Sequence, residues 1–245
     1  YYFKETQGCD PGENFNCLQN GVEIIDKMPA KWQNISSAVK ALERLLDAKN
    51  VEQKKAAWPI ILSENKTLAE EAFRLKIDKA AAKLEAADQE GMRRGLYFLQ
   101  DKISAAKVAS IMPGEWQRKP FVKHRISRCF YGPTYRAPFF IDELTNDIDY
   151  YPEAYLNKLA SEGINGLWLT MYFHDLPSSI FKGRGENAEK RFAKLRQTVA
   201  KCAQYGIKIY VFFSEPKLFG NASYTVPLQD AEACPEIIGG QHEDW

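Results

Sequence analysis

The second half of the chain alternates apolar runs with amphipathic segments. Residues 125–132, 164–173 and 207–213 are short runs rich in aliphatic and aromatic residues, whereas 152–163 and 188–206 carry apolar residues at helical spacing. We therefore predict the order strand, helix, strand, helix, strand. This order is typical of parallel strands joined by right-handed crossovers.

Helix start and stop signals support this order. Pro152 fits the first position of its helix, and Gly163 and Gly206 fit the positions just past the two helix ends. The apolar stripe predicted for the second helix comprises Phe192, Leu195, Val199 and Ala203.

The third apolar run ends on a carboxylate, Glu215, followed by a proline. Residues 207–213 are apolar on both alternating faces, which predicts a strand buried on both sides. Glu215 is then either a site residue at the carboxyl end of the strand or the polar end of a buried strand.

The first half of the chain has a different pattern. Residues 1–20 predict an irregular arm, and 22–26 and 58–64 predict short strands. Residues 35–48 predict a helix with Ser36 as its N-cap. The apolar face of that helix comprises Val39, Leu42, Leu45 and Leu46.

Two rules conflict over residues 71–103. Their content of Ala, Lys, Glu and Leu favours one long helix, but apolar and charged residues alternate strictly over 73–78 and more weakly over 82–86. We predict a hairpin, followed by a helix that starts at Gly91. The prolines and glycine of 110–120 predict a linker.

Composition narrows the class of protein. The 245 residues are 45% apolar and 27% charged, with a net charge of +1, which gives no general attraction to nucleic acid or anionic membranes. The apolar runs are too short to span a bilayer. No signal peptide is visible, and because the sequence begins with Tyr1 we expect a processed or trimmed product.

The residues that bind metals in other proteins are scattered here. The three histidines are not at ligand spacing, so we expect no metal and no cofactor. Among the five cysteines only Cys9 and Cys17 are close in sequence. They either form a disulfide or, as we favour, remain reduced like the others.

Two architectures fit the alternating half: a doubly wound sheet and an eight-stranded barrel. No glycine-rich phosphate loop follows any strand, which disfavours a nucleotide-binding protein. Positions 125 to 245 comprise 121 residues (245 − 125 + 1), about half of the roughly 250 that a barrel needs. We therefore predict the α/β class, and a barrel, if these units belong to one, would be about half present.

The region 22–108 resembles the accessory domain that precedes the barrel in family 20 glycoside hydrolases, the β-N-acetylhexosaminidases. That domain has a strand of the form Glu-Ala-aromatic-x-Leu-x-Ile, a second strand ending in Ala-Ala, and a helix containing Gly-x-x-x-Gly-Leu. The matching residues are Glu71, Ala72, Phe73, Leu75, Ile77, Ala86, Ala87, Gly91, Gly95, Leu96, Leu99 and Gln100.

Residues 121–220 resemble the start of the family's barrel more loosely. Arg128 matches the arginine that grips sugar hydroxyls, His174 and Asp175 match the loop after the second strand, and Glu215 matches the carboxylate after the third. The Asp, Gly and His that follow that carboxylate in the family are missing here. The family's catalytic Asp-Glu pair follows a fourth strand, and no fourth strand is evident before Trp245.

Each candidate has a second interpretation. Arg128 can simply form an ion pair at a strand end, and His174–Asp175 is either a sugar-binding pair, a catalytic dyad or a surface turn. Tyr131 is a candidate for stacking on a sugar ring, whereas Trp168 in mid-strand is expected in the core. The adjacent Glu243 and Asp244 reverse the order of the catalytic pair and fit a polar loop.

The resemblance implies a glycoside hydrolase-like protein that acts on N-acetylhexosamine-containing or related glycans. We expect an irregular arm at 1–20, a small α+β accessory domain at 21–110 and, at 121–245, the first three βα units of an incomplete (β/α)8 TIM-type barrel. The substrate-binding candidates are Arg128, Tyr131, His174, Asp175 and Glu215. The catalytic acid is unassigned, so we expect a fragment that is inactive by itself.

The alternative is a non-catalytic carbohydrate-binding or scaffolding protein that keeps the glycosidase fold. In either case the expected partners are an oligosaccharide and the missing remainder of the barrel, with no nucleic acid and no membrane span. The resemblance also implies a secreted or periplasmic location.

Overall fold

The computed structural model describes residues 15–106, 108–131, 133–134, 141–171, 175–179, 185–213 and 228–233. The chain divides into two compact units. The first unit comprises Tyr1–Arg125, Tyr151–Asn165 and Lys201–Lys208, and the second unit comprises Ile126–Tyr150, Gly166–Ala200 and Ile209–Trp245. The chain therefore returns twice to the first unit after leaving it.

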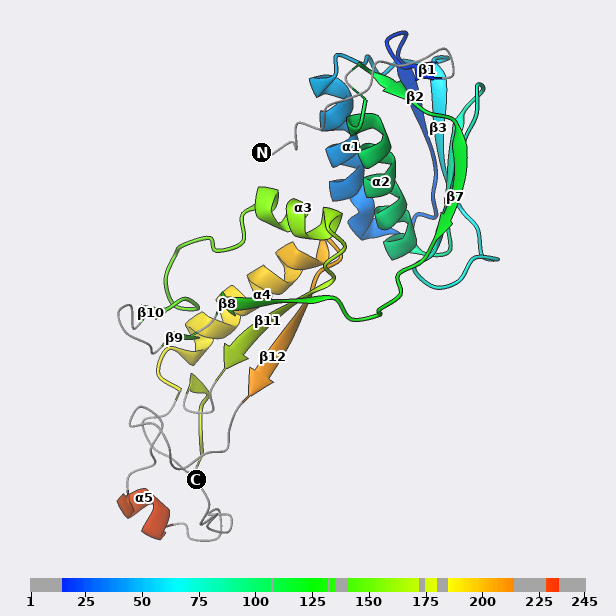
Figure 1. Ribbon diagram of the computed structural model, residues 1–245. Helices are drawn as coiled ribbons and strands as arrows, with labels where there is room; N and C mark the ends of the chain where they lie inside the picture. Colours follow the sequence, from blue (N-terminus) through cyan, green and yellow to red (C-terminus); the bar gives the residue numbers. More distant parts are fainter. Residues whose placement is uncertain are drawn as a thin grey trace. The chain divides into compact units, whose positions relative to one another are not determined.

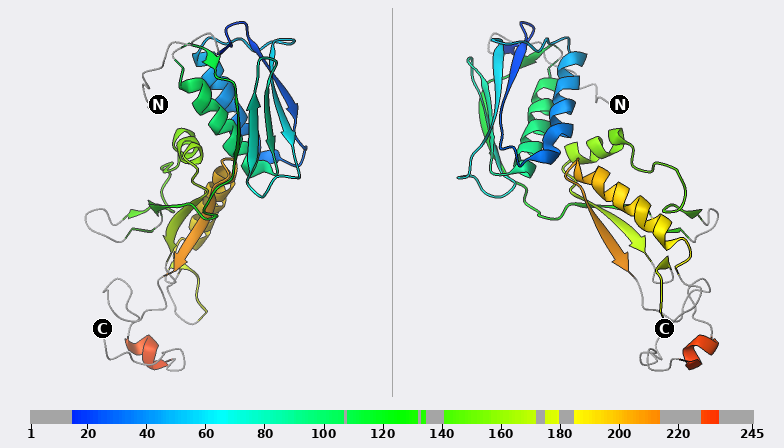
Figure 2. Two further views of the ribbon diagram at one scale, coloured as in Figure 1. Left: turned by 45° about the vertical axis from the view of Figure 1, so that its right-hand side comes forward. Right: turned by 180° about the vertical axis from the view of Figure 1, so that it is seen from behind.

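The first unit contains a five-stranded mixed sheet with the strand order β2-β3-β5-β4-β7. The strands β2 (Val22–Lys27), β3 (Trp58–Glu64) and β5 (Ala82–Ala86) are parallel. The strands β4 (Phe73–Ile77) and β7 (Gly114–Arg118) complete the sheet with antiparallel pairings. The helices α1 (Ser36–Ala48) and α2 (Gln89–Ser104) both lie on one face of this sheet (Figure 1 and Figure 2).

The core of the first unit lies between this sheet and these two helices. Its side chains come from α1, α2, β3, β4 and β5, as expected for a layer of helices packed on a sheet. The largest fully buried side chains include Leu42, Leu46, Ile60, Leu62, Leu75, Leu84, Met92, Leu96, Leu99 and Ile103. The helix α3 (Glu153–Ser161) belongs to the same unit and buries Leu156.

The predicted hairpin within 71–103 is confirmed. Phe73 pairs with Ala86 and Ile77 with Ala82, and the residues of β4 alternate between buried and more exposed positions. The alternation of apolar and charged residues therefore outweighs the helical composition, because burying one face of a strand stabilises more than propensity does.

The helix after this hairpin starts two residues earlier than predicted, at Gln89. Asp88 is its N-cap, and its carboxylate accepts a hydrogen bond from the Gly91 backbone N–H at 2.8 Å. The prediction that Ser36 caps α1 is wrong. A short 3-10 helix, Gln33–Ile35, leads directly into α1, whose N-cap is Ile35 and has no side-chain cap bond.

The predicted linker at 110–120 is also wrong. It contains β6 (Ser110–Ile111) and the edge strand β7, so proline and glycine here bracket strands and do not mark a loop. Within the predicted irregular arm, residues 1–14 lie outside the described ranges, whereas β1 (Asn16–Cys17) pairs with β6 and Leu18 is fully buried.

The second unit contains a three-stranded sheet with the order β12-β11-β8. The strand β8 (Ile126–Tyr131) is parallel to β11 (Gly166–Met171), and β12 (Lys208–Phe213) lies on the other side of β11. The helix α4 (Ala188–Ala203), which connects β11 to β12, runs alongside these strands (Figure 1).

Three short elements complete the description of this unit. The strands β9 (Pro133–Thr134) and β10 (Ile141–Asp142) form an antiparallel pair in the connection after β8. The short helix α5 (Leu228–Ala233) follows β12 in the chain. The predicted order of strand, helix, strand, helix, strand is confirmed, and it corresponds to β8, α3, β11, α4 and β12.

The buried face of α4 differs from the predicted stripe. Val199 is 44% exposed, whereas the polar residues Arg191 and Thr198 are buried. The buried positions of α4 and the turn after it are Ala188, Arg191, Thr198, Cys202 and Tyr205. Arg191 can occupy this face because acidic groups and backbone carbonyls satisfy its guanidinium.

The strand β12 is less covered than its sequence predicts. Val211 is 41% exposed and Phe212 is 45% exposed, although Phe212 packs edge-on against Trp168 with ring centroids 5.1 Å apart. Within the described sheet β12 is an edge strand, so an apolar sequence on both faces does not ensure burial on both faces.

Candidate functional site

In parallel sheets, binding and catalytic residues gather in the connections that follow the carboxyl ends of the strands. Of the five candidates from the sequence, His174 and Glu215 lie outside the described residues. Arg128 and Tyr131 contribute their backbones to β8, and their side chains are not described. Asp175 is the one candidate whose side-chain surroundings are defined.

The strand that carries Arg128 and Tyr131 is irregular. Arg128 is in register with Trp168 of β11, but Tyr131 is in register with the next residue, Leu169. The register shift therefore falls between Arg128 and Tyr131, the two candidates on β8. Such irregularities bend a strand and redirect its side chains, and they are frequent next to active sites.

Asp175 follows β11 and is almost completely buried, at 1% exposure. Its carboxylate oxygen Oδ1 lies 3.6 Å from Nη2 of Arg191, and its backbone carbonyl accepts a hydrogen bond from Nη1 at 3.1 Å. Arg191 is itself buried and also donates to the backbone carbonyl of Glu186. The side chain of Asp175 is thus directed at Arg191 and not at solvent.

Asp142 of β10 is the second acidic partner of Arg191. Its Oδ2 accepts from Nε of Arg191 at 2.7 Å, and its Oδ1 accepts from the backbone N–H of Leu144 at 3.0 Å. Both carboxylate oxygens are therefore engaged. Leu144 is also fully buried, so the turn at Asp142 is held both by the contact with Arg191 and by the packing of Leu144.

Lys194 extends the same contact one helical turn further along α4. Its Nζ donates to the backbone carbonyl of Ile148 at 2.9 Å and to Oδ1 of Asn146 at 3.1 Å, and it lies 5.1 Å from the centre of the Tyr150 ring. Burial lowers the pKa of Lys194 from its ordinary value. The amino-terminal half of α4 therefore holds the segment 142–150 through two cationic side chains.

This arrangement can fix two loops in place, but its described carboxylates face a cation of the chain itself. No group of three or more metal-binding side chains occurs among the described residues. The described helices include none that is long and apolar enough to cross a bilayer.

Sequence reasoning missed Arg191 and Asp142. Arg191 lies outside the apolar stripe that the sequence predicts for its helix, and Asp142 belongs to a strand of only two residues. The available signal was the spacing of Arg191 and Lys194, three residues apart on α4, which places both side chains on one face.

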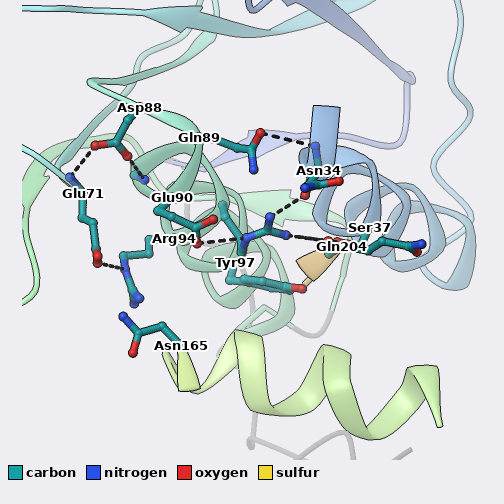
Figure 3. A network of polar contacts seen from close by, with 12 residues as sticks. Asn34, Ser37, Glu71, Asp88, Gln89, Glu90, Arg94, Tyr97, Asn165 and Gln204 are labelled. Carbon is teal, nitrogen blue, oxygen red and sulfur yellow. Dashed lines mark hydrogen bonds and ion pairs between the residues drawn. The ribbon is translucent and has the colours of Figure 1, made fainter. Parts of the chain in front are cut away.

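The first unit contains a separate polar network, part of which Figure 3 shows around Glu71 and Asp88. The carboxylate of Asp88 accepts from the backbone N–H groups of Glu71 and Gly91, at 2.7 and 2.8 Å. Glu71 has a backbone φ of +56°, a left-handed conformation that is unfavourable for a residue with a Cβ. Its carboxylate lies 3.2 Å from Nε of Arg94 and 2.7 Å from Nη2 of Arg125.

Arg125 directly precedes β8 and connects this network to the start of β11. Its Nε donates to the carbonyl of Gly163 at 2.8 Å, and its backbone N–H donates to Oδ1 of Asn165 at 2.8 Å. Asn165 in turn donates from Nδ2 to the carbonyl of Lys123 at 2.8 Å. These contacts fix the chain just before two strands of the sheet, where stability rather than catalysis is expected to reside.

Arg93 of α2 forms the buried centre of the remaining contacts. Its Nη1 donates to the carbonyl of Gln204 at 3.0 Å and to Oγ of Ser37 at 3.1 Å, and its Nη2 donates to the carbonyl of Asn34. Its Nε lies 3.2 Å from Glu90. One side chain thus joins α2, the start of α1 and the residues after α4.

Comparison with known proteins gives a class of fold. No protein-family model matches the chain, and no curated protein matches it. Solved structures do match, and glycoside hydrolases are among them. The chain therefore has a glycoside hydrolase-like α/β fold.

Three solved enzymes illustrate the likeness. A family 138 glycoside hydrolase targeting pectin rhamnogalacturonan II aligns over 78% of this chain and 24% of its own, with 15% identity and a TM-score of 0.54. A β-N-acetylhexosaminidase from Bacteroides fragilis aligns over 83% and 41%, with 16% identity and a TM-score of 0.54. A family 20 exo-β-N-acetylglucosaminidase from Vibrio harveyi, in complex with N-acetylglucosamine, aligns over 80% and 33%, with 17% identity and a TM-score of 0.51.

The chain therefore spans less than half of each of these enzymes. At this level of identity the likeness establishes the fold alone. Fold does not specify reaction, which depends on the residues of the site.

Proposed function

We propose that this protein is a glycoside hydrolase-like protein that acts on N-acetylhexosamine-containing or related glycans. The observation that carries the proposal is the glycoside hydrolase-like fold together with the matching motif residues on β4, β5 and α2. Family 20 enzymes are among the structural neighbours, and the sequence motif points to the same family independently.

The proposal includes a barrel. Residues 121–245 supply the strands β8, β11 and β12, which we propose are its first three strands, preceded by an accessory domain at 21–110. The exposed apolar side chains of Ile126, Val211 and Phe212 support this, because further strands would cover them.

The proposed reaction follows the substrate-assisted route implied by the family resemblance, an exception to the use of two protein carboxylates. The 2-acetamido oxygen of the sugar attacks the anomeric carbon, an Asp orients that amide, and a Glu protonates the leaving oxygen. We assign Arg128, Tyr131, His174 and Glu215 to substrate binding and leave the acid unassigned.

Asp175 favours a second candidate function, a carbohydrate-binding protein without hydrolysis. Its carboxylate was a candidate substrate ligand, but it is buried against Arg191. A glycosidase fold that turns this carboxylate inward, away from a ligand, is suited to binding without hydrolysis.

A chromogenic N-acetyl-β-glucosaminide separates these functions. We expect a longer product of the same reading frame, and not the 245-residue chain by itself, to release the chromophore from this substrate. The matched control is the β-glucoside, which lacks the 2-acetamido group and should release none if the mechanism is substrate-assisted.

Binding of N,N′-diacetylchitobiose by calorimetry completes the test. Binding without release would support the carbohydrate-binding function, and Arg128→Ala should then weaken it. If neither release nor binding is detected, both functions are refuted.

A further inference from the structure

Arg191 joins three segments that belong to the connections after two neighbouring parallel strands. Asp142 lies in the connection that follows β8, and Asp175 and Glu186 lie in the connection that follows β11. Arg191 itself lies in the first turn of α4. These are the connections in which α/β proteins carry their binding and catalytic residues.

We infer that Arg191 is a positioning residue, which holds Asp175 and Glu186 of the connection after β11 against Asp142 of the connection after β8, so that glycan binding at this end of the sheet depends on it. The inference rests on the proposed function, because His174, a candidate substrate ligand, directly precedes Asp175 in the chain. Arg191 acts through these loops and does not contact the substrate itself.

The chemistry of the side chain fits this role. A guanidinium has five donors in a rigid planar fork, so one group can satisfy acceptors from several directions. Here it meets the carboxylates of Asp142 and Asp175 and the backbone carbonyls of Asp175 and Glu186. A lysine at this position has one nitrogen and cannot reach all three segments with the same geometry.

The backbone around Arg191 is built for close contact between the same segments. Gly185 has a φ of +74°, and a Cβ added there would lie 2.4 Å from the backbone nitrogen of Pro177. The turn before α4 therefore approaches the backbone after Asp175 directly. Within that turn, the backbone N–H of Ala188 donates to Gly185 at 3.0 Å, and that of Arg191 donates to Asn187 at 3.0 Å.

A role in stability alone explains this cluster less well. Taking charges out of water offsets most of their attraction, so a buried ion pair contributes less to stability than a well-packed apolar group of the same size. What directed charge pairs do provide is one fixed arrangement of the groups that they join. Fixed loops matter for binding, since a displacement of about 1 Å can reduce activity about a hundredfold.

The test compares variants of the full 245-residue chain by binding of N,N′-diacetylchitobiose and by urea unfolding. We expect Arg191→Gln to weaken binding by about tenfold to a hundredfold. Arg191→Lys should recover part of the loss. Asp142→Asn removes one charge and keeps the acceptor for Leu144, so it gives a milder second variant if Arg191→Gln does not fold.

Two controls separate positioning from general stability. Arg93→Gln breaks a comparably buried arginine cluster in the first unit and should reduce the urea midpoint while leaving the affinity unchanged. Arg196→Gln changes an exposed arginine on the same helix and should alter neither quantity.

The outcomes are distinct. Loss of affinity in Arg191→Gln but not in Arg93→Gln supports the inference. Wild-type affinity in Arg191→Gln, or equal losses of affinity in both variants, overturns it and leaves the proposed function standing. If the wild-type chain binds no glycan, the proposed function fails and the inference fails with it.

Discussion

A carboxylate oxygen of Glu71 lies 2.7 Å from the guanidinium of Arg125, so two residues 54 positions apart in the sequence form an ion pair. Both side chains are largely buried, at 15% and 17% exposure, and Arg94 shares the same carboxylate. The pair connects the turn before β4 to the residue before β8, in a part of the first unit that carries none of the candidate substrate ligands.

We expect Glu71→Gln to destabilise the protein, because it leaves two partly buried guanidinium groups without their anion. The free energy of unfolding should fall by about 1–2 kcal/mol, less than for a fully buried pair. Urea unfolding monitored by tryptophan fluorescence measures this change.

Glu70→Gln is the matched control for that measurement. Glu70 lies 3.7 Å from Lys123, but both side chains are more than two-thirds exposed, so its loss should be about 0.5 kcal/mol or less. Equal losses in the two variants would show that burial of the Glu71 pair has no energetic consequence.

The cap of α2 gives a second prediction. The two carboxylate oxygens of Asp88 accept from two different backbone N–H groups, so Asp88→Ala should lower the free energy of unfolding by about 1–2 kcal/mol. Asp88→Asn keeps one acceptor oxygen and should lose about half as much. A loss in Asp88→Asn as large as that in Asp88→Ala would contradict the two-bond account.

The two glycines of α2 should differ in their tolerance of a methyl group. A Cβ at Gly91 would lie 2.4 Å from the backbone carbonyl oxygen of Ala72, whereas a Cβ at Gly95 would lie 2.5 Å from the side chain of Leu84. The side chain of Leu84 can rotate away, but the backbone of Ala72 cannot.

Gly91→Ala should therefore reduce the free energy of unfolding by about 2 kcal/mol. Gly95→Ala should cost less, because the higher helix propensity of alanine, about 1 kcal/mol, offsets part of the crowding. Denaturation midpoints of the two variants give the order, and a greater loss at Gly95 would be the opposite of what we expect.

Tyr97 makes the stability of the protein sensitive to alkaline pH. Burial raises the pKa of its phenol to about 12, and the hydroxyl donates to Oδ1 of Asn157 at 2.8 Å. Between pH 10 and 12 the unfolded chain releases this proton while the folded chain retains it. The free energy of unfolding contributed by Tyr97 is therefore complete below pH 10 and decreases as the pH rises.

Tyr97→Phe removes both the hydrogen bond and this dependence. We expect the wild type to be more stable than the variant by about 1 kcal/mol at pH 8, with the difference shrinking at pH 10 and above. Urea unfolding at pH 8, 10 and 11 gives the difference directly. A difference that stays constant over this range would rule out Tyr97 as its source.

The elements that sequence predicted best are those with a strict period. The alternation from Phe73 to Ile77 and the helical spacing of Leu42, Leu45 and Leu46 both match the burial found in the structure. In each case one face of the element supplies the core of the first unit, so the pattern and the fold agree.

Prediction was wrong where the burial or pairing of a residue depends on a partner that is distant in the sequence. The apolar stripe predicted for α4 includes Val199 and leaves out Arg191, whereas Arg191 is buried against two carboxylates and Val199 is 44% exposed. The strand β7 was assigned to a linker because its flanking glycine and prolines are visible in the sequence, whereas its pairing with β4 is not. Such partners lie far away in the chain and leave no local signal.

The place of Asp175 in the fold was predictable from the sequence, but the partner of its side chain was not. The connections after parallel strands were the expected place, and Asp175 does lie in one of them. Sequence alone could not tell whether its carboxylate faces a ligand or a cation of the chain, since that depends on the helix face that Arg191 occupies.

The carbonyl of Gln204, which receives Ser37 and Arg93, has a consequence for biosynthesis. Gln204 is made 111 residues after Arg93 and 167 after Ser37. A ribosome adds residues at about 5–20 per second, so the amino-terminal sheet and its helices emerge several seconds before that carbonyl exists. During this interval the guanidinium of Arg93 has Asn34, Ser37 and Glu90 as partners but lacks the Gln204 carbonyl, so a nascent chain stalled before Gln204 would carry an incomplete first unit.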